Sequence, residues 1–164
     1  MTEQVGDRLV FEGEPYLMWR SPLQRYFELI GNAPPFLAYA TCCWRGYCGH
    51  WTIEDGQLWL DGLEGHIAEP PLVDIADRAF AHKIDYEDRS LCREATLGDI
   101  FPDRTGRVFA DWFTGTVDVV QWNPADPFYR GARLEIDLVR GGVTDSRPTK
   151  GDPRPVLLRC PPSD

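Results

Sequence analysis

The chain has 164 residues, of which 43% are hydrophobic and 12% aromatic, and its formal net charge is -9. This length suits one domain with a well-filled core, so neither wholesale disorder nor a second domain is expected. The excess of 26 acidic over 17 basic residues repels phosphate backbones and anionic lipid, so we expect no nucleic-acid ligand and favour a basic partner.

The same composition bears on the compartment. No apolar run approaches the roughly 20 residues that span a bilayer, and residues 1–7 lack the basic start and apolar core of a secretion signal. The five cysteines are odd in number, and Cys42 and Cys43 are adjacent, which does not suit a disulfide framework. We therefore expect reduced thiols, no membrane contact and a cytoplasmic location.

The first predicted elements are a hairpin and a helix. Two β-prone runs within residues 8–19 surround a glycine-containing turn. Residues 22–30 then carry an apolar stripe at helical spacing, with Ser21 and Gln24 as an expected capping box and Gly31 as the stop. The stripe consists of Leu23, Tyr26, Phe27 and Ile30.

The middle of the chain changes to strand patterns. Residues 51–60 form a second predicted hairpin, because Asp55-Gly56 suits the positive φ angles of a tight turn. Residues 68–95 give a weaker pattern, from which we expect a short helix. Residues 96–102 are typical of a capped single turn that ends at a proline.

The last third predicts more strands. Residues 108–122 form one long strand or two strands bent at Gly115, and residues 134–143 form a third hairpin. Residues 1–147 are then one globular domain, and residues 148–164 a proline-rich tail. The predicted fold class is α+β and predominantly antiparallel β, with the amphipathic helix packed on one twisted sheet.

One cysteine-rich segment could carry chemistry. Cys42, Cys43, Cys48 and His50 lie within nine residues, but a zinc site usually uses two separated ligand pairs, and adjacent cysteines point apart on a strand. We therefore expect no metal and no cofactor. Cys48 and His50 could lie on one strand face, as a nucleophile and its base would.

Asp111 stands between aromatic residues, so burial would raise its pKa and suit it to general acid catalysis. Alternatively, it lies at a sheet edge or pairs with an arginine such as Arg45. The chain contains no signature of a serine hydrolase, zinc protease, phosphate loop or dinucleotide site. A small hydrolase with an acidic or thiol site around Asp111 or Cys48/His50 is thus the alternative hypothesis.

Aromatic residues outside the clearest apolar positions favour protein binding. Some of them should reach the surface, where rings beside acidic residues suit a basic partner; a second buried face under the helix explains them equally well. These candidates are Trp44, Tyr47, Trp59, Trp122 and Tyr129.

Two stretches carry a resemblance. Residues 44–54, WRGYCGHWTIE, and residues 108–115, VFADWFTG, resemble a family of small stand-alone bacterial proteins of unassigned function. The resemblance implies a bacterial origin and an independent domain, and it carries over no catalytic residue. An acidic domain with spare aromatic residues and no catalytic signature leads us instead to expect a non-enzymatic protein-binding domain, with an immunity-type protein that neutralises a basic bacterial toxin as the leading form.

Overall fold

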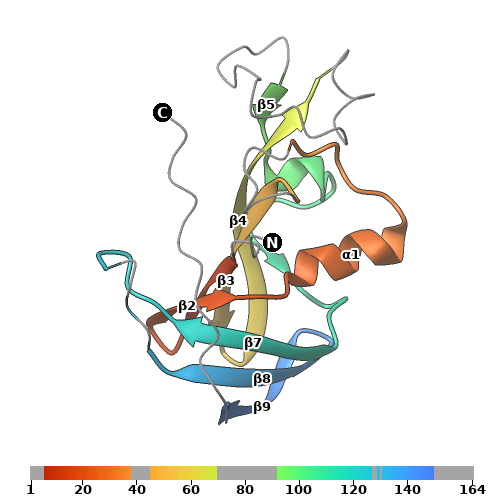
Figure 1. Cartoon of the computed structure of the whole chain (residues 1–164). Helices are drawn as coiled ribbons and strands as arrows, with labels where there is room; N and C mark the ends of the chain where they lie inside the picture. The colour runs from red at the N-terminus through yellow and green to blue at the C-terminus, as the bar shows by residue number, and fades with distance from the viewer. Residues whose placement is uncertain (1–5, 38–44, 70–91, 127–128, 130, 150–164) are drawn as a thin grey trace.

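A computed structural model describes residues 6–37, 45–69, 92–126, 129 and 131–149 (Figure 1). The short helix expected within residues 68–95 falls mostly outside these ranges. Residues 92–94, at the end of that segment, are described and form a strand. The elements are β1 (Asp7–Phe11), β2 (Glu14–Met18), α1 (Pro22–Ile30), β3 (Tyr47–Glu54), β4 (Gln57–Ala68), β5 (Cys92–Glu94), the 3-10 helix η4 (Leu97–Asp99), β6 (Val108–Phe109), β7 (Gly115–Gln121), β8 (Arg133–Val139) and β9 (Gly142–Pro148).

Seven strands close into a barrel in the order β3-β1-β2-β7-β8-β9-β4, and β4 pairs back onto β3. The join between β4 and β9 is short: Gln57 opposes Gly142, and the Val143 N–H donates to the Gly56 carbonyl at 2.7 Å. The predicted β-rich character and single helix are confirmed, but the open twisted sheet is wrong. Strand patterns alternate equally in a sheet and in a barrel, so the sequence does not show closure.

The three predicted hairpins are confirmed. Each turns on two residues with positive φ, namely Glu12-Gly13, Asp55-Gly56 and Arg140-Gly141. Such turns match the twist of the strands that they join. All strand pairs among the described residues are antiparallel except β1 with β3, where Phe11 lies opposite Ile53, so the turns that follow these two strands lie at the same end of the barrel.

Helix α1 packs against the barrel through aromatic residues. Phe27 is buried, with its ring centroid 5.7 Å from that of Tyr47, and Tyr26 contacts Phe101 and Trp112. Ile30 is 50% exposed, so the predicted stripe holds only for its first three members. The helix ends at Gly31 with a left-handed conformation, as expected.

The segment 108–122 divides into β6 and β7, with β7 starting at Gly115. Between them the chain turns, and the indole N–H of Trp112 donates to the Pro22 carbonyl at 2.8 Å. Residues 96–102 contain the expected single turn, capped by reciprocal Thr96 and Asp99 bonds. Strand β9 extends through Pro148, one residue into the predicted tail.

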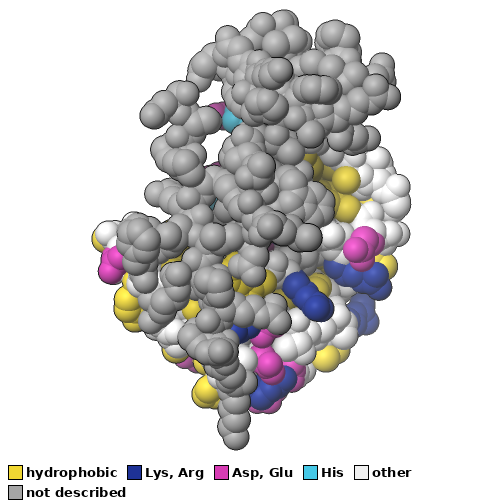
Figure 2. All heavy atoms as spheres, viewed as in Figure 1, with side chains coloured by type: hydrophobic (Ala, Val, Ile, Leu, Met, Phe, Trp, Pro, Cys, Tyr) yellow, Lys and Arg dark blue, Asp and Glu magenta, His cyan; other side chains and the backbone are white. Residues whose placement is uncertain are grey.

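Figure 2 gives the surface on the side drawn in Figure 1. On this side, dark-blue and magenta side chains lie together beside α1 and over the lower strands of the barrel, β8 and β9. The charges exposed here are therefore of both signs, despite the acidic balance of the whole chain.

Candidate functional site

One row of outward-facing side chains crosses three strands of the barrel wall, β1, β3 and β4, and the short strand β6 that pairs with β4. Val10 on β1 lies opposite Thr52 on β3, Thr52 opposite Trp59 on β4, and Trp59 opposite Phe109 on β6. Directly opposed residues share a face of a sheet, and the neighbours of these four along each strand are buried in the barrel. We call Val10, Thr52, Trp59 and Phe109 the outer row.

The outer row is apolar for a solvent-facing surface. Val10 is 45% exposed, and the other three side chains are half-buried. The rings of Trp59 and Phe109 pack with their centroids 5.3 Å apart. Thr52 separates Val10 from the two paired rings, so the row places one exposed valine and two half-buried rings on the same outer face.

Arg107 of the same chain contacts the Trp59 ring of the outer row. The guanidinium carbon of Arg107 lies 4.4 Å from the centroid of the Trp59 ring, and the same guanidinium pairs with the Glu54 carboxylate. Arginine over an indole ring is a favourable cation–π arrangement, and the carboxylate holds the cation in place. This part of the wall therefore binds a guanidinium within the molecule itself.

Carboxylates border the outer row at one end of the barrel. Glu54 is the last residue of β3, Asp55 lies in the β3–β4 turn and Glu12 in the β1–β2 turn; all three are exposed. The parallel pairing of β1 with β3 brings the two turns together. Farther along the wall, the Asp61 carboxylate accepts a hydrogen bond from Thr52. The row thus presents rings and a valine bordered by carboxylates, one of which, Glu54, is paired with Arg107.

The structure separates the other predicted aromatic candidates. Trp122 is half-buried in a second outer cluster with Leu17, Val120 and Trp19, and the Arg8 guanidinium carbon lies 5.8 Å from its ring centroid. Tyr129 is 39% exposed. Trp44 lies outside the described residues.

Tyr47 is a correction to the set of surface candidates. It is only 4% exposed, because its ring packs into the core against Phe27 and Phe36. Trp51 and Ile53 lie on the same inward face of β3 as Tyr47, because every second residue of a strand points to the same side. The Tyr47 ring cannot contribute to a contact surface.

The thiol candidate has an unsuitable setting for a nucleophile. Burial raises the pKa of the Cys48 thiol to about 12, and the nearby Asp7 carboxylate adds to the rise. The Sγ atom lies 3.5 Å from the Gly6 carbonyl oxygen. The His50 Nε2 atom instead lies 3.3 Å from a Glu64 carboxylate oxygen, although the two are not aligned for a hydrogen bond. At neutral pH the thiol is protonated, and no described contact joins it to an imidazole.

The carboxylate candidate is also not in a pocket. Asp111 lies in the turn between β6 and β7, is exposed, and forms no hydrogen bond or ion pair with another described residue. Burial was the condition for an acid role of Asp111, and it is not met, because this stretch leaves the sheet at Ala110 and Asp111 is exposed. Its suggested pairing with Arg45 is wrong as well, since Arg45 pairs with Asp7.

The sequence did not reveal a charged cluster inside the barrel. Asp7 is fully buried; it pairs with Arg45 and accepts from the Gly49 backbone N–H at 3.0 Å and the Trp51 indole N–H at 2.8 Å. Three donors thus satisfy one carboxylate, and Arg45 also donates to the Tyr47 carbonyl at 3.0 Å. The described bonds of this cluster join β1 to β3 and to the residues just before β3, so we interpret the cluster as structural.

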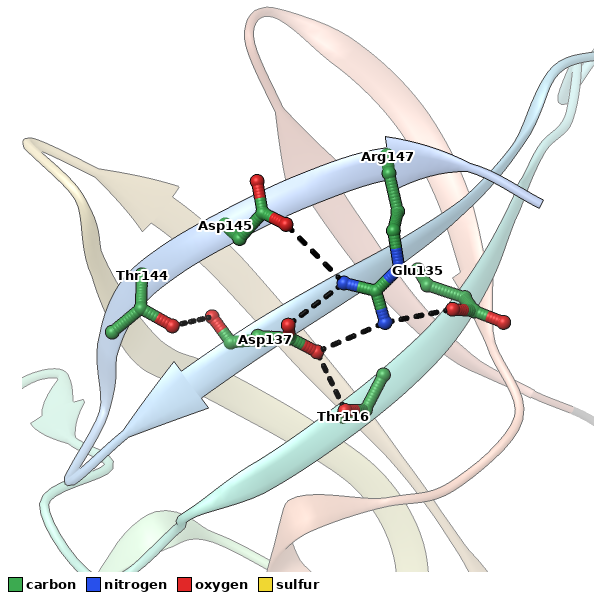
Figure 3. Close-up of polar contacts among 6 residues, drawn as sticks. All are labelled: Thr116, Glu135, Asp137, Thr144, Asp145 and Arg147. Atoms are coloured by element: carbon green, nitrogen blue, oxygen red, sulfur yellow. Dashed lines mark hydrogen bonds and ion pairs between the residues drawn. The ribbon is translucent and has the colours of Figure 1, made fainter.

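A second charged cluster lies on the outside of β7, β8 and β9 (Figure 3). Arg147 contacts three carboxylates, those of Glu135 at 2.8 Å, Asp137 at 2.7 Å and Asp145 at 3.4 Å. Its hydrogen bond lowers the pKa of Asp137 below the usual range, and a bond from the Thr116 hydroxyl adds to this. The four charged groups of this network contact one another, so few of their hydrogen-bonding positions remain for a partner protein.

Sequence reasoning found Trp59 but missed Val10 and Phe109. A signal existed for Val10, which alternates with the apolar Leu9 and Phe11 and so must face outward if they face the core. The row itself rests on the pairing of strands that are far apart in sequence. No local pattern contains it.

Among the described residues, no three His, Cys, Asp or Glu side chains are grouped as a metal site requires. None of the described helices is long and apolar enough to cross a membrane. No family model, no curated protein and no solved structure matches this chain. The family resemblance seen in the sequence therefore stays a prediction.

Proposed function

We propose that this domain is a non-enzymatic protein-binding module that uses the outer row to bind a basic protein. Its leading specific form is an immunity-type protein that neutralises a basic bacterial toxin in the cytoplasm. The observation that carries the proposal is Arg107, whose guanidinium stacks on Trp59 and pairs with Glu54. A partner's arginine meets the same chemistry on the neighbouring rings and carboxylates.

The charge distribution supports this choice of partner. The whole chain carries a formal charge of -9, and exposed carboxylates of Glu12, Glu54 and Asp55 border the outer row. Opposite charge on a partner steers the encounter and raises the association rate more than it raises affinity. An acidic surround is therefore suited to rapid capture of a basic toxin.

The apolar residues of the outer row would supply most of the binding energy, whereas charge mainly raises the association rate. Binding energy at protein interfaces is concentrated in a few buried aromatic and arginine side chains, surrounded by contacts that exclude water. Trp59 and Phe109 are half-exposed rings of this type, and Val10 extends the apolar strip across β1. Together with the charged border, they give the outer row both parts of an interface.

The hydrolase alternative is not adopted. It needs a reactive thiolate or a carboxylate in a pocket, whereas the pKa of the Cys48 thiol is raised to about 12 and Asp111 is exposed in a turn. No described contact links Asp111, Cys48 and His50.

The test uses two variants with the same change of charge. Val10→Lys places a cation in the outer row, and Leu29→Lys places one on α1, where Leu29 is 53% exposed. The wild-type chain and both variants serve as baits in lysates of the encoding bacterium. Association rates of each recovered protein are then measured at two salt concentrations.

We expect a basic protein that binds the wild type and the Leu29→Lys variant, and that binds Val10→Lys at least about tenfold more weakly. Its association with the wild type should slow at the higher salt, because salt screens the steering charges. Recovery of acidic partners alone, equal binding to both variants, or a salt-independent rate would each refute the proposal.

A further inference from the structure

Arg107 lies against the outer surface of β3 and β4. Its guanidinium carbon is 4.4 Å from the centroid of the Trp59 ring on β4, and its guanidinium pairs with the Glu54 carboxylate at the end of β3. The Phe109 ring on β6 packs beside the indole, with its centroid 5.3 Å away. We call Glu54, Trp59 and Phe109 the arginine seat, since an aromatic face beside a carboxylate is suited to a guanidinium group.

The rings of the seat are fixed by the barrel. Trp59 lies opposite Phe109 in the pairing of β4 with β6. Next to them, the Ala110 N–H donates to the Leu58 carbonyl at 3.0 Å, and the Leu58 N–H donates to the Gly141 carbonyl at 2.8 Å. A Cβ atom at Gly141 would lie 2.9 Å from the Phe109 ring, so this ring packs against the β8–β9 turn. The positions of the two rings therefore depend on the barrel rather than on Arg107, and such a preformed site binds without a large ordering cost.

Arg107 is the exchangeable part of this contact. It follows exposed residues 102–106, and its side chain is 43% exposed while that of Glu54 is 52% exposed. Ion pairs and cation–π contacts at such exposed positions contribute little to stability. Rotation about side-chain bonds withdraws the guanidinium and leaves the backbone at the buried Val108 in place. A competing guanidinium can therefore displace that of Arg107.

A second arginine beside an indole ring is placed differently. The Arg8 guanidinium carbon lies 5.8 Å from the centroid of the Trp122 ring, and an Arg8 nitrogen lies 3.6 Å from a Glu64 carboxylate oxygen. Arg8 lies within β1, which is paired on both sides, and its side chain is 27% exposed. Of the two arginines, Arg107 has the closer ring contact and the more exposed side chain, so its seat is the one that a partner reaches.

We propose that Arg107 occupies, in the free protein, the seat that an arginine side chain of the basic partner takes in the complex. This inference rests on the proposed function for its partner, and it adds the residue type that the partner presents and the internal contact that is replaced. The exchange leaves no carboxylate unpaired, because the incoming guanidinium pairs with Glu54 as Arg107 turns into solvent. Arginine is favoured over lysine, since its planar guanidinium both stacks on an indole and pairs with a carboxylate through two donors.

The first test measures how much Arg107 competes with the partner. Arg107→Ala empties the seat, and Arg104→Ala removes the same charge from an exposed arginine that lies over Phe101 instead, at 5.6 Å. Calorimetry gives the affinity of each variant for the basic protein recovered with the wild-type chain. Apparent affinity falls by the fraction of time that a site is occupied, so we expect Arg107→Ala to bind about three- to tenfold more tightly than Arg104→Ala.

The second test needs no protein partner. The peptide acetyl-Gly-Arg-Gly-amide and its lysine counterpart are titrated at constant ionic strength, and the Trp59 indole N–H resonance, assigned with Trp59→Phe, is followed by NMR. The Trp51 resonance is the internal control, because its indole N–H is bonded to Asp7 inside the barrel. We expect saturable shifts of Trp59 alone, with the arginine peptide binding more tightly than the lysine peptide, and at least about threefold more tightly to Arg107→Ala than to wild type.

Either of two results would overturn the inference: a recovered protein that binds Arg107→Ala no more tightly than Arg104→Ala, or an arginine peptide that does not bind Arg107→Ala more tightly than wild type. The first result leaves the proposed function standing, since a partner then binds beside Arg107. If no basic protein is recovered, the proposed function fails and the peptide titration alone decides the inference. Equal melting temperatures of the two alanine variants check that both are folded.

Discussion

The barrel wall separates two arginine–aspartate pairs that have the same chemistry and different surroundings. Inside, Asp7 is 0% and Arg45 9% exposed, and two further donors complete the carboxylate's bonding. Outside, Asp137 is 33% and Arg147 42% exposed, and Arg147 is shared among three carboxylates. Little water reaches the inner pair, whereas water can hydrogen-bond to each member of the outer pair.

This difference shows why neither pair is a contact site, although both are conspicuous. The inner pair fixes the start of β1 against β3, and the outer network ties β8 to β9. The outer row differs from both, because its rings and its exposed valine are only partly used by Arg107. Substitutions of the two pairs therefore measure stability, and substitutions of the outer row test the proposed binding.

The largest effect is expected from Asp7→Asn, which keeps the shape of the side chain and removes its charge. It leaves the buried Arg45 guanidinium without its carboxylate, and breaking a buried ion pair in this way costs about 3–5 kcal/mol. Urea unfolding followed by tryptophan fluorescence gives the change in unfolding free energy. A loss under about 1 kcal/mol would mean that the inner pair behaves like a surface pair.

The Cys48 thiol beside the inner pair should be strongly protected. Its pKa is raised from 9.0 to about 12, so at pH 8 the native chain holds about a thousandfold less thiolate than the unfolded chain. Iodoacetamide labelling, read by mass spectrometry of the peptide that contains Cys48, should therefore be slower by at least this factor in native protein. Equal rates in native and urea-unfolded protein would show that the thiol is accessible and ionised.

The inner cluster also shows where prediction from sequence stops. Hairpins were predictable because Asp55-Gly56 and Gly141 specify turns locally, and the helix because its stripe and Gly31 lie within ten residues of one another. The partners of Asp7 lie 38 to 44 residues further along the chain. Only the parallel pairing of β1 with β3 brings them together, and no local pattern encodes that pairing.

The candidate site, too, could be predicted only in part from the sequence. Trp59 was found because an aromatic residue stands opposite to the apolar positions of its strand, which is a local observation. Its neighbours Val10 and Phe109 come from β1 and β6, and their placement depends on register across the closed barrel. Asp111 was misplaced because its aromatic neighbours suggested a strand, whereas Trp112 turns away to bond with Pro22.

A smaller effect is expected where Gly49 approaches the inner pair. A Cβ atom there would lie 2.5 Å from the Trp51 Nε1 and 2.7 Å from an Asp7 carboxylate oxygen, so Gly49→Ala must displace one of them. Overpacking of this kind costs about 1–3 kcal/mol. Gly62→Ala on β4 is the control, because nothing lies within 4 Å of a Cβ at that position. Equal unfolding free energies for the two variants would contradict the close approach.

The smallest effect is expected from Asp137→Asn, the counterpart of Asp7→Asn on the outside of the wall. An exposed pair contributes little, and removing one of three neighbouring carboxylates also relieves repulsion between Asp137 and the other two, Glu135 and Asp145. At neutral pH we expect the melting temperature to change by no more than about 2 °C. A change as large as that of Asp7→Asn would remove the distinction between the two pairs.

The lowered pKa of Asp137 predicts how the stability difference between wild type and Asp137→Asn changes with pH. Arg147 lowers the pKa of Asp137 in the folded state, so ionised Asp137 stabilises the fold at pH values above the ordinary aspartate pKa of about 3.9. That contribution is lost as the pH falls through the lowered folded-state pKa. The difference in melting temperature between wild type and Asp137→Asn should therefore be constant from pH 7 to about 5 and shrink below about 4. Scanning calorimetry across this range measures it, and a difference that grows on acidification would show that Asp137 is not held in its charged form by Arg147.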